Sequence, residues 1–196
     1  MMIKQFNLKI KKYWKLLIMI SVSYLIIHAE SGKSIENHRI YSNQNDIICE
    51  SNYLKYIIGN DGTNKAFIDK KTGVDYLAKI QSISFMSIEK DGRKYPASSV
   101  RYSEGMLRVQ FKNSTISAEV KVESKEKYLT FEIVNLSDKN IDKLTMMEIH
   151  LTITDSIGSL VSIARNKEFA GCVMGLNMET NTSAGTTSQG IQSDTR

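Results

Sequence analysis

The acidic residues of this chain are of a type that could catalyse a reaction when two of them act as a pair. Two carboxylates on opposite sides of a glycosidic bond can hydrolyse it, because one acts as an acid and the other as a base or nucleophile. Aspartates beside glycine turns more commonly accept hydrogen bonds from nearby backbone N–H groups. No motif sets one pair apart, so we expect none of these residues to be catalytic. The candidates are Asp61, Asp69, Asp75, Glu148, Asp155 and Glu168.

Oxygen ligands for a cation gather in the stretch "NDGTNKAFID", as Asn60, Asp61, Asn64 and Asp69. Their spacing differs from the calcium-binding loop D-x-[DN]-x-[DN]-G, so a solvated turn is the favoured interpretation. A zinc site is not expected either, because the chain has no C-x-x-C pair and its remaining histidines are isolated. We therefore predict no metal and no cofactor.

A serine or cysteine nucleophile has little support in the sequence. No G-x-S-x-G turn occurs, and only His38 and His150 would be left to serve as a base. Glu148 and His150 would share the polar face of a strand predicted at 149–153.

The two cysteines, Cys49 and Cys172, admit two interpretations. A disulfide between them would close a long loop and add about 4 to 5 kcal/mol in the chain-entropy model. Two buried free thiols are the alternative, since Cys172 alternates with the apolar Met174, Leu176 and Met178. The spacing does not decide between them.

Aromatic rings could form a sugar-binding platform, because their apolar faces stack against sugar C–H groups. The only tryptophan, Trp14, lies in the N-terminal leader. Tyr53 and Tyr56 are three residues apart and therefore fall on opposite faces of a strand. Ligand-binding residues stay unassigned, and a half-buried position at the edge of the core is the better expectation for each tyrosine. The tyrosines after the leader are Tyr41, Tyr53, Tyr56, Tyr76, Tyr95, Tyr102 and Tyr128.

The elements that must position these side chains are predicted to be β-strands. Apolar residues alternate with polar ones at 107–111, 116–122, 129–133 and 149–153, which indicates strands with one buried face. Turn signals separate the runs at "GNDG", "KKTG", "KDG", "SEG" and "LSDKN", and no helical period follows residue 30. We predict an all-β fold, an antiparallel β-sandwich over residues 47–179.

The N-terminus predicts export. Residues 1–29 carry five lysines and no acid, and removing these five from the 26 basic residues leaves 21, equal to the 21 acidic ones. The basic character therefore belongs to the leader and does not indicate a nucleic-acid partner. Lysines up to Lys15, an apolar run at 16–27 and a small residue at Ala29 form a signal peptide with cleavage after Ala29. The alternative is an uncleaved anchor, although the run is shorter than the ~20 residues that span a bilayer.

Two polar segments flank the predicted sandwich. Residues 30–46 lack periodicity and are interpreted as a flexible linker. Residues 180–196, rich in threonine, serine and glycine, are interpreted as a disordered low-complexity tail. Glycosylation sequons begin at Asn113, Asn135 and Asn181 and would matter only in a host that glycosylates them.

The stretch 47–76 resembles the first strands of the N-terminal β-sandwich domain of large exported bacterial glycoside hydrolases. The segments 91–111 and 169–182 fit the same domain, so the resemblance covers about residues 47 to 182. The matching residues belong to turns and core strands. They are Asn52, Leu54, Tyr56, Ile58, Asp61, Gly62, Phe67, Asp69, Lys70, Thr72, Gly73, Asp75 and Tyr76.

This resemblance implies a galactose-mutarotase-like or similar supersandwich, acting as an accessory module in polysaccharide breakdown. The related proteins continue with a catalytic region, so none of their catalytic carboxylates carries over to this chain. We therefore expect a truncated, non-catalytic module, secreted or periplasmic, whose partner is a polysaccharide or a catalytic domain. Nucleic acid is not expected as a partner, nor is a membrane after signal cleavage. The alternatives are a stand-alone glycan-binding protein and an assembly subunit that offers a sheet edge to a partner strand.

Overall fold

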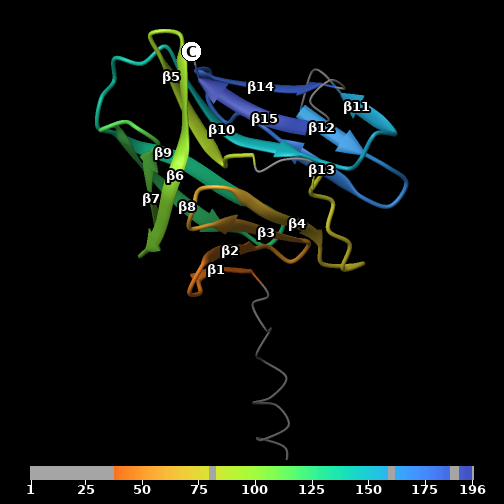
Figure 1. The fold of residues 1–196 in the computed structure, drawn as a ribbon. Helices are drawn as coiled ribbons and strands as arrows, with labels where there is room; N and C mark the ends of the chain where they lie inside the picture. Colours follow the sequence, from red (N-terminus) through yellow and green to blue (C-terminus); the bar gives the residue numbers. More distant parts are fainter. Residues whose placement is uncertain (1–37, 80–82, 159–161, 186–189, 196) are drawn as a thin grey trace, which may run out of the picture. The chain divides into compact units, whose positions relative to one another are not determined.

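The structure, a computed structural model, describes residues 38–79, 83–158, 162–185 and 190–195. The predicted signal peptide, with its cleavage site, lies outside these residues. Every element within them is a β-strand, and all strand pairs are antiparallel (Figure 1). The predicted all-β antiparallel class is therefore confirmed, and the stacked sheets fit a β-sandwich. No helix in this part of the chain is long and apolar enough to cross a membrane.

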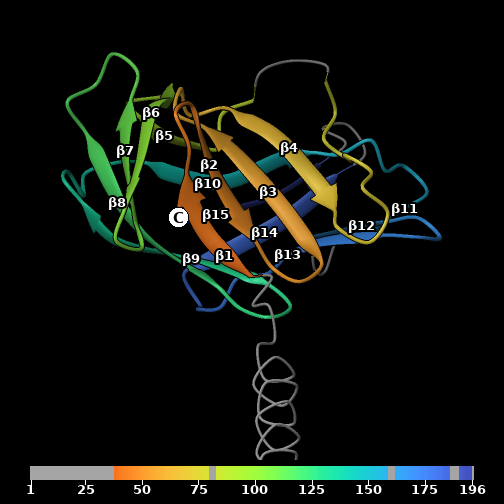
Figure 2. The same ribbon diagram turned by 90° about the horizontal axis from the view of Figure 1, so that it is seen from below.

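The first layer is a four-stranded sheet in the order β1-β2-β3-β4 (Figure 2). Alternation places Ile47, Cys49 and Tyr56 on its inner face, where they are fully buried. The strands are β1 (Arg39–Ser42), β2 (Asp46–Glu50), β3 (Leu54–Gly59) and β4 (Asn64–Asp69).

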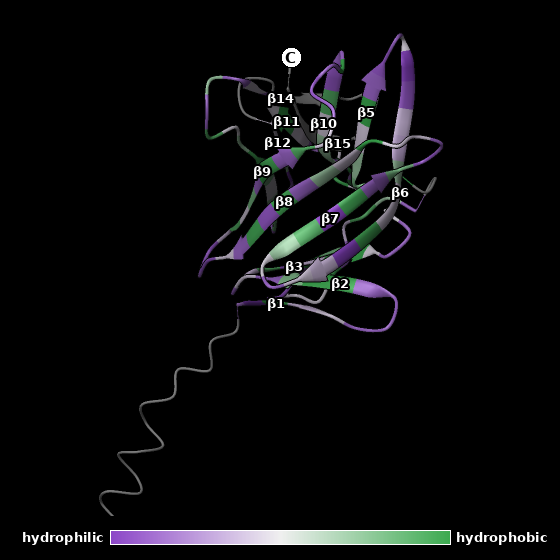
Figure 3. Ribbon diagram, turned by 90° about the vertical axis from the view of Figure 1, so that its left-hand side faces the viewer, coloured by the Kyte–Doolittle hydropathy of each residue, from purple (hydrophilic) through white to green (hydrophobic). Residues whose placement is uncertain are grey.

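The second layer is an eight-stranded sheet in the order β14-β15-β10-β5-β6-β7-β8-β9, so that β9 forms one of its edges. Hydrophobic and hydrophilic residues alternate visibly along β7 and β8 (Figure 3). Its strands are β5 (Met86–Lys90), β6 (Arg93–Ser103), β7 (Met106–Phe111), β8 (Ser117–Ser124), β9 (Leu129–Leu136), β10 (Lys143–His150), β14 (Thr180–Gly185) and β15 (Gly190–Thr195). A small third sheet consists of β11 (Ser156–Gly158), β12 (Ser162–Arg165) and β13 (Ala170–Val173).

Two hairpins of the large sheet follow from their glycine turn signals. Asp91 and Gly92 have φ values of 51° and 68° between β5 and β6. Glu104 and Gly105 have φ values of 51° and 80° between β6 and β7. Two consecutive residues with positive φ match the twist of the adjoining strands, which is why a residue-glycine pair closes such turns.

Aromatic rings join the two large sheets in the core. Tyr56 on β3 lies 5.9 Å from Phe67 on β4, 6.5 Å from Phe85 and 6.4 Å from Phe131 on β9, measured between ring centroids. Phe85 in turn lies 5.9 Å from Phe131. Because Phe131 belongs to an edge strand, this cluster ties that edge to the opposite layer.

Three predicted boundaries are corrected. Residues 39–42 of the predicted linker form β1, because Ile40 packs against the core and the strand pairs with β2. The predicted strand at 149–153 begins earlier, at residue 143, and ends at His150. The predicted disordered tail contains β14 and β15, which pair with each other and through β15 with β10. Composition missed these strands, because backbone hydrogen bonds to an existing sheet edge need little apolar burial.

Candidate functional site

Two of the candidate aspartates, Asp61 and Asp69, hold turns. Asp61 accepts hydrogen bonds from the Thr63 N–H at 3.0 Å and from Lys65 Nζ at 2.8 Å. Asp69 is buried and accepts from the Lys71 N–H at 2.9 Å and from the Thr72 hydroxyl at 2.7 Å. Each carboxylate is therefore occupied within its own turn.

Asp75 is a bridge between neighbouring strands. Its carboxylate accepts from the Phe67 N–H at 2.9 Å, the Leu77 N–H at 3.0 Å and Lys79 Nζ at 2.7 Å. Partial desolvation raises the pKa of this carboxyl, but the hydrogen bonds from Lys79, Phe67 and Leu77 outweigh it and lower the pKa below its usual value. A carboxylate with three donors is held in its charged form, which suits a structural role.

Asp61 should make stability depend on pH. Partial desolvation raises its pKa, but hydrogen bonds from Lys65 and Thr63 outweigh it and lower the pKa to about 2, from 3.8. A carboxyl whose pKa is lower when folded stabilises the fold above the unfolded pKa, and that contribution disappears as the pH falls towards 2. We expect Asp61→Asn, which keeps the turn, to lose less stability than wild type between pH 4 and pH 2. Urea midpoints measured across this window check this, and identical pH profiles would contradict it. The effect should be small, since the side chain is 56% exposed and solvent screens it.

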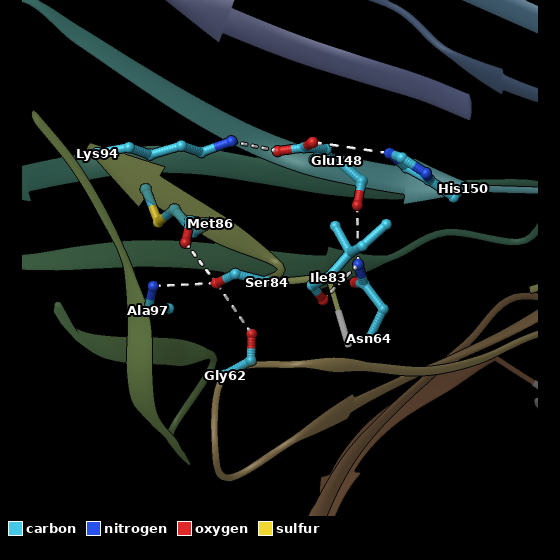
Figure 4. A network of polar contacts seen from close by, with 9 residues as sticks. All are labelled: Gly62, Asn64, Ile83, Ser84, Met86, Lys94, Ala97, Glu148 and His150. Carbon is cyan, nitrogen blue, oxygen red and sulfur yellow. Dashed lines mark hydrogen bonds and ion pairs between the residues drawn. The ribbon is translucent and has the colours of Figure 1, made fainter. Parts of the chain in front are cut away.

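The four proposed calcium ligands do not converge. Asn60 donates its side-chain N–H to the Gln44 carbonyl at 3.1 Å. The side chain of Asn64 is buried and joins three elements, because its amide donates to the carbonyls of Ile83 at 3.1 Å and Glu148 at 2.8 Å (Figure 4). Its oxygen accepts the hydrogen bond of the Tyr56 hydroxyl. In the described ranges, no three histidine, cysteine or acidic side chains are grouped as metal ligands would be.

Glu148 and His150 do come together, and Lys94 joins them. Glu148 accepts from Lys94 Nζ at 2.9 Å and lies 3.6 Å from His150 Nε2 (Figure 4). Met147, with φ of 59°, lies where the β10–β15 register shifts. A bulge of this kind re-aims side chains, and here it places Glu148 and His150 side by side. One carboxylate neutralised by a lysine cannot supply the acid and base roles that glycoside hydrolysis needs.

The other chemical candidates are dispersed. Asp155 and Glu168 are exposed in the connections before β11 and before β13. Tyr53 and Tyr128 are 54% and 57% exposed, while Tyr56 is fully buried, so Tyr53 and Tyr56 form no joint platform. The sequon residues Asn113, Asn135 and Asn181 are exposed, and His38 is half-buried just before β1.

Both cysteines are free thiols, Cys49 buried and Cys172 exposed. The disulfide interpretation is therefore not realised in the structure, and the alternative of two buried thiols fits Cys49 alone. Burial raises the pKa of the Cys49 thiol to about 12, and partial burial also raises the pKa of the Cys172 thiol.

The two thiols should differ in reactivity. The thiolate is the reactive form, so burial and a high pKa together should protect Cys49, whereas Cys172 is accessible. We expect a thiol-reactive dye at pH 8 to label one cysteine per native chain and two in guanidinium chloride. Peptide mapping should place the native label on Cys172. No labelling of the native protein, or labelling of both residues at equal rates, would contradict this.

Glu50 anchors a charge cluster that the sequence did not reveal. Its side chain is 10% exposed and lies 3.7 Å from Arg39 Nε, 3.5 Å from Lys55 Nζ and 3.5 Å from Lys70 Nζ. The register of β1, β2 and β3 aligns Arg39, Glu50 and Lys55 in one row. This cluster fixes the order of three strands, and only knowledge of that register could have found it.

A groove of about 880 Å³ is a further site-like feature of the described residues. One wall is the edge strand β9, with Leu129, Phe131 and Ile133, and the other includes Leu144 and Met146 of β10. The chain around and after β13 completes it and exposes Met174, Leu176 and Met178 by 60%, 78% and 103%. The charged residues around the groove are Lys121, Glu123, Glu132, Lys139, Asp142, Lys143 and Glu179.

This groove, the β9 groove, was missed by sequence reasoning. Alternation predicted that Leu129, Phe131 and Ile133 face inward, and these residues are in fact half-buried. Alternating apolar residues show which face of a strand is buried, but they do not show whether another strand lies beside it. The exposed methionines and leucine at 174–178 were the signal in the sequence that could have indicated the groove.

No protein-family model matches this chain, and no curated protein matches it.

Proposed function

We propose that this chain is a non-catalytic accessory β-sandwich module of an exported polysaccharide-degrading system, and that its β9 groove docks a partner protein domain. The observation that carries the proposal is the groove together with the exposed apolar side chains of Met174 and Leu176 in its lining, since large exposed apolar patches mark interaction sites. The supersandwich fold and the link to polysaccharides rest on the resemblance of residues 47–182 to glycoside-hydrolase N-terminal domains. The export by a signal peptide cleaved after Ala29 rests on the lysines and the apolar run of residues 1–29.

The lining of the β9 groove favours protein over sugar. Sugar sites commonly present flat exposed rings, but Phe131 is the one aromatic side chain along this groove, and it is half-buried in the core cluster. Methionines and leucines such as Met146, Met174 and Leu176 adapt their shape and are common at protein-binding surfaces. An apolar floor with a charged rim is also the usual anatomy of a protein interface.

The acidic candidates support a role without catalysis. Asp61, Asp69 and Asp75 each accept hydrogen bonds that stabilise turns or strands, and Glu148 is neutralised by Lys94. A glycosidase needs two carboxylates that face one bond, with one of them protonated. Within the described part of the chain these acids are committed to other tasks.

Cross-linking tests the docking role. The full chain is expressed with its leader in an exporting bacterium together with an exported glycoside hydrolase, and a short amine-reactive linker is added. We expect cross-links from Lys139, which is exposed beside the β9 groove, to the hydrolase. Leu176→Lys should reduce them at least tenfold, whereas Val74→Lys, at an exposed apolar position outside the groove, should not.

Three results would count against the proposed function. Cross-links from Lys139 that persist in Leu176→Lys would remove the groove from the interaction. Release of reducing sugars from polysaccharides by the purified chain alone would make it an enzyme. Retention of the full-length protein in the membrane fraction would show that the N-terminal segment is an uncleaved anchor and not a cleaved signal peptide.

Glycan binding remains a second candidate, favoured by the exposure of Tyr53 and Tyr128. Stacking on an exposed ring predicts saturable binding to a soluble polysaccharide. Affinity electrophoresis in gels that contain starch, xylan or pectin measures it. Retardation that is lost in Tyr53→Ala or Tyr128→Ala would establish this function in place of protein docking.

A further inference from the structure

The open edge of β9 exposes backbone hydrogen-bonding groups in a regular pattern. The hairpin between β8 and β9 closes with a hydrogen bond from the Lys125 N–H to the Tyr128 carbonyl at 2.9 Å. Antiparallel pairs alternate between hydrogen-bonded and non-hydrogen-bonded ones. Leu129, Phe131 and Ile133 pair with Ser124, Val122 and Val120, which are the non-hydrogen-bonded positions. The N–H and C=O groups of these three residues therefore point away from β8.

No strand among the described residues pairs with this side of β9. Edge strands of soluble proteins are usually protected by lysine, proline, a bulge or shortness. Residues 129–133 contain no lysine or proline and one charged residue, Glu132, and the bulge of β9 comes only afterwards, where Val134 is 48% exposed. By contrast, the edge strand β1 has four residues and begins with Arg39.

The residues that present the open backbone groups also line the β9 groove. Leu129, Phe131 and Ile133 are half-buried, and Leu144 and Met146 of β10 form the facing wall. A strand laid along this edge would place alternate side chains in the groove, next to those of β9. Apolar side chains fit those positions, and polar ones would point to solvent.

We propose that the β9 edge binds an extended polypeptide segment of the partner, with apolar residues at alternate positions, as an added strand of the large sheet. The hydrogen-bonding pattern of β8 and β9 then continues into the partner, so the existing ladder sets the position of the added strand. A glycan cannot match this row, because it lacks alternating N–H and C=O groups. The inference rests on the proposed docking role of the β9 groove and specifies its occupant.

The test uses a fluorescein-labelled peptide of eight residues in which valine and threonine alternate between terminal lysines. We expect it to bind the full chain saturably in a fluorescence polarisation titration. Bound peptide should slow amide hydrogen exchange at Leu129, Phe131 and Ile133, but not at Thr130 and Glu132, whose N–H groups already face β8. The same peptide with N-methylated amides on the pairing side should bind at least tenfold more weakly.

A matched pair of variants separates the backbone from the side chain. Leu129→Pro removes one open N–H without breaking the β8 ladder, and Leu129→Val shortens the side chain but keeps that N–H. We expect the proline variant to weaken peptide binding at least tenfold and the valine variant less than threefold. Thermal unfolding of both variants shows that they fold.

Strand addition would be overturned by uniform protection of residues 129–133, by equal affinity for the N-methylated peptide, or by no binding. Protection of the same three amides in the chain alone, rising with its concentration, would also overturn it, because the occupant would then be a second copy. If the cross-links from Lys139 to the hydrolase persist in these cases, the proposed docking at the β9 groove still holds. Only the proposal that the partner binds as an added strand is then rejected.

Discussion

Gly62→Ala is expected to destabilise the fold by about 2 to 5 kcal/mol, from left-handed backbone strain of about 1 to 2 kcal/mol and overpacking of about 1 to 3 kcal/mol. Gly62 has φ of 79°, and a Cβ built there would lie 2.8 Å from the backbone and the Cβ of Ala97. Its carbonyl also accepts from the Phe85 N–H at 2.8 Å, so movement of Gly62 would disturb the junction between the two sheets. The free energy of unfolding from urea titrations measures the loss.

Gly73→Ala is the matched control. Gly73 has φ of 77°, but nothing lies within 4 Å of a Cβ built there. It should therefore show only the backbone strain, about 1 to 2 kcal/mol. Equal losses of unfolding free energy in the two variants would show that movement relieves the contact with Ala97. The junction between the sheets would then be more easily deformed than the structure indicates.

Asn64→Leu is expected to lower the free energy of unfolding by about 3 to 5 kcal/mol. Leaving one buried polar group without a hydrogen-bond partner costs about 1 to 3 kcal/mol, and this change affects several such groups. The substitution keeps the side-chain size but leaves the Ile83 and Glu148 carbonyls without their partner (Figure 4). It also leaves the Tyr56 hydroxyl without its acceptor. Tyr56 is fully buried, so water cannot replace that hydrogen bond. Chemical denaturation measures this loss as well.

Two controls make the result specific. Asn52→Leu changes an exposed asparagine and should cost less than about 0.5 kcal/mol, as surface substitutions usually do. In a Tyr56→Phe background, Asn64→Leu should cost less than in wild type, because the hydroxyl is no longer there to be orphaned. Strict additivity of the two changes would show that the Tyr56–Asn64 hydrogen bond contributes nothing to stability.

The strand faces and the turns were predictable from local sequence. Alternation placed Leu107, Val109 and Phe111 on the buried face, where the structure has them. The glycines of "KDG" and "SEG" marked tight hairpins, because only residues that tolerate positive φ close them. Both kinds of inference depend on neighbours in the chain, for which the sequence is sufficient.

The candidate site was less accessible to the same reasoning. Asn64 was considered as a calcium ligand, although it is a buried link between β4, the start of β5 and β10. Glu148 and His150 were correctly placed together, but Lys94, which neutralises Glu148, lies 54 positions away. The strands β14 and β15 were hidden by a polar composition typical of disorder.

What the sequence determined by itself was the all-β class and which side of most strands is buried, because a period of two has one meaning wherever a strand lies. What only the tertiary structure decided was the order of the strands. That order leaves the backbone groups of Leu129, Phe131 and Ile133 at an open edge beside the β9 groove. Alternation is the same in a central strand and in an edge strand, so pairing partners, and with them the proposed binding edge, follow from contacts between residues far apart in the chain.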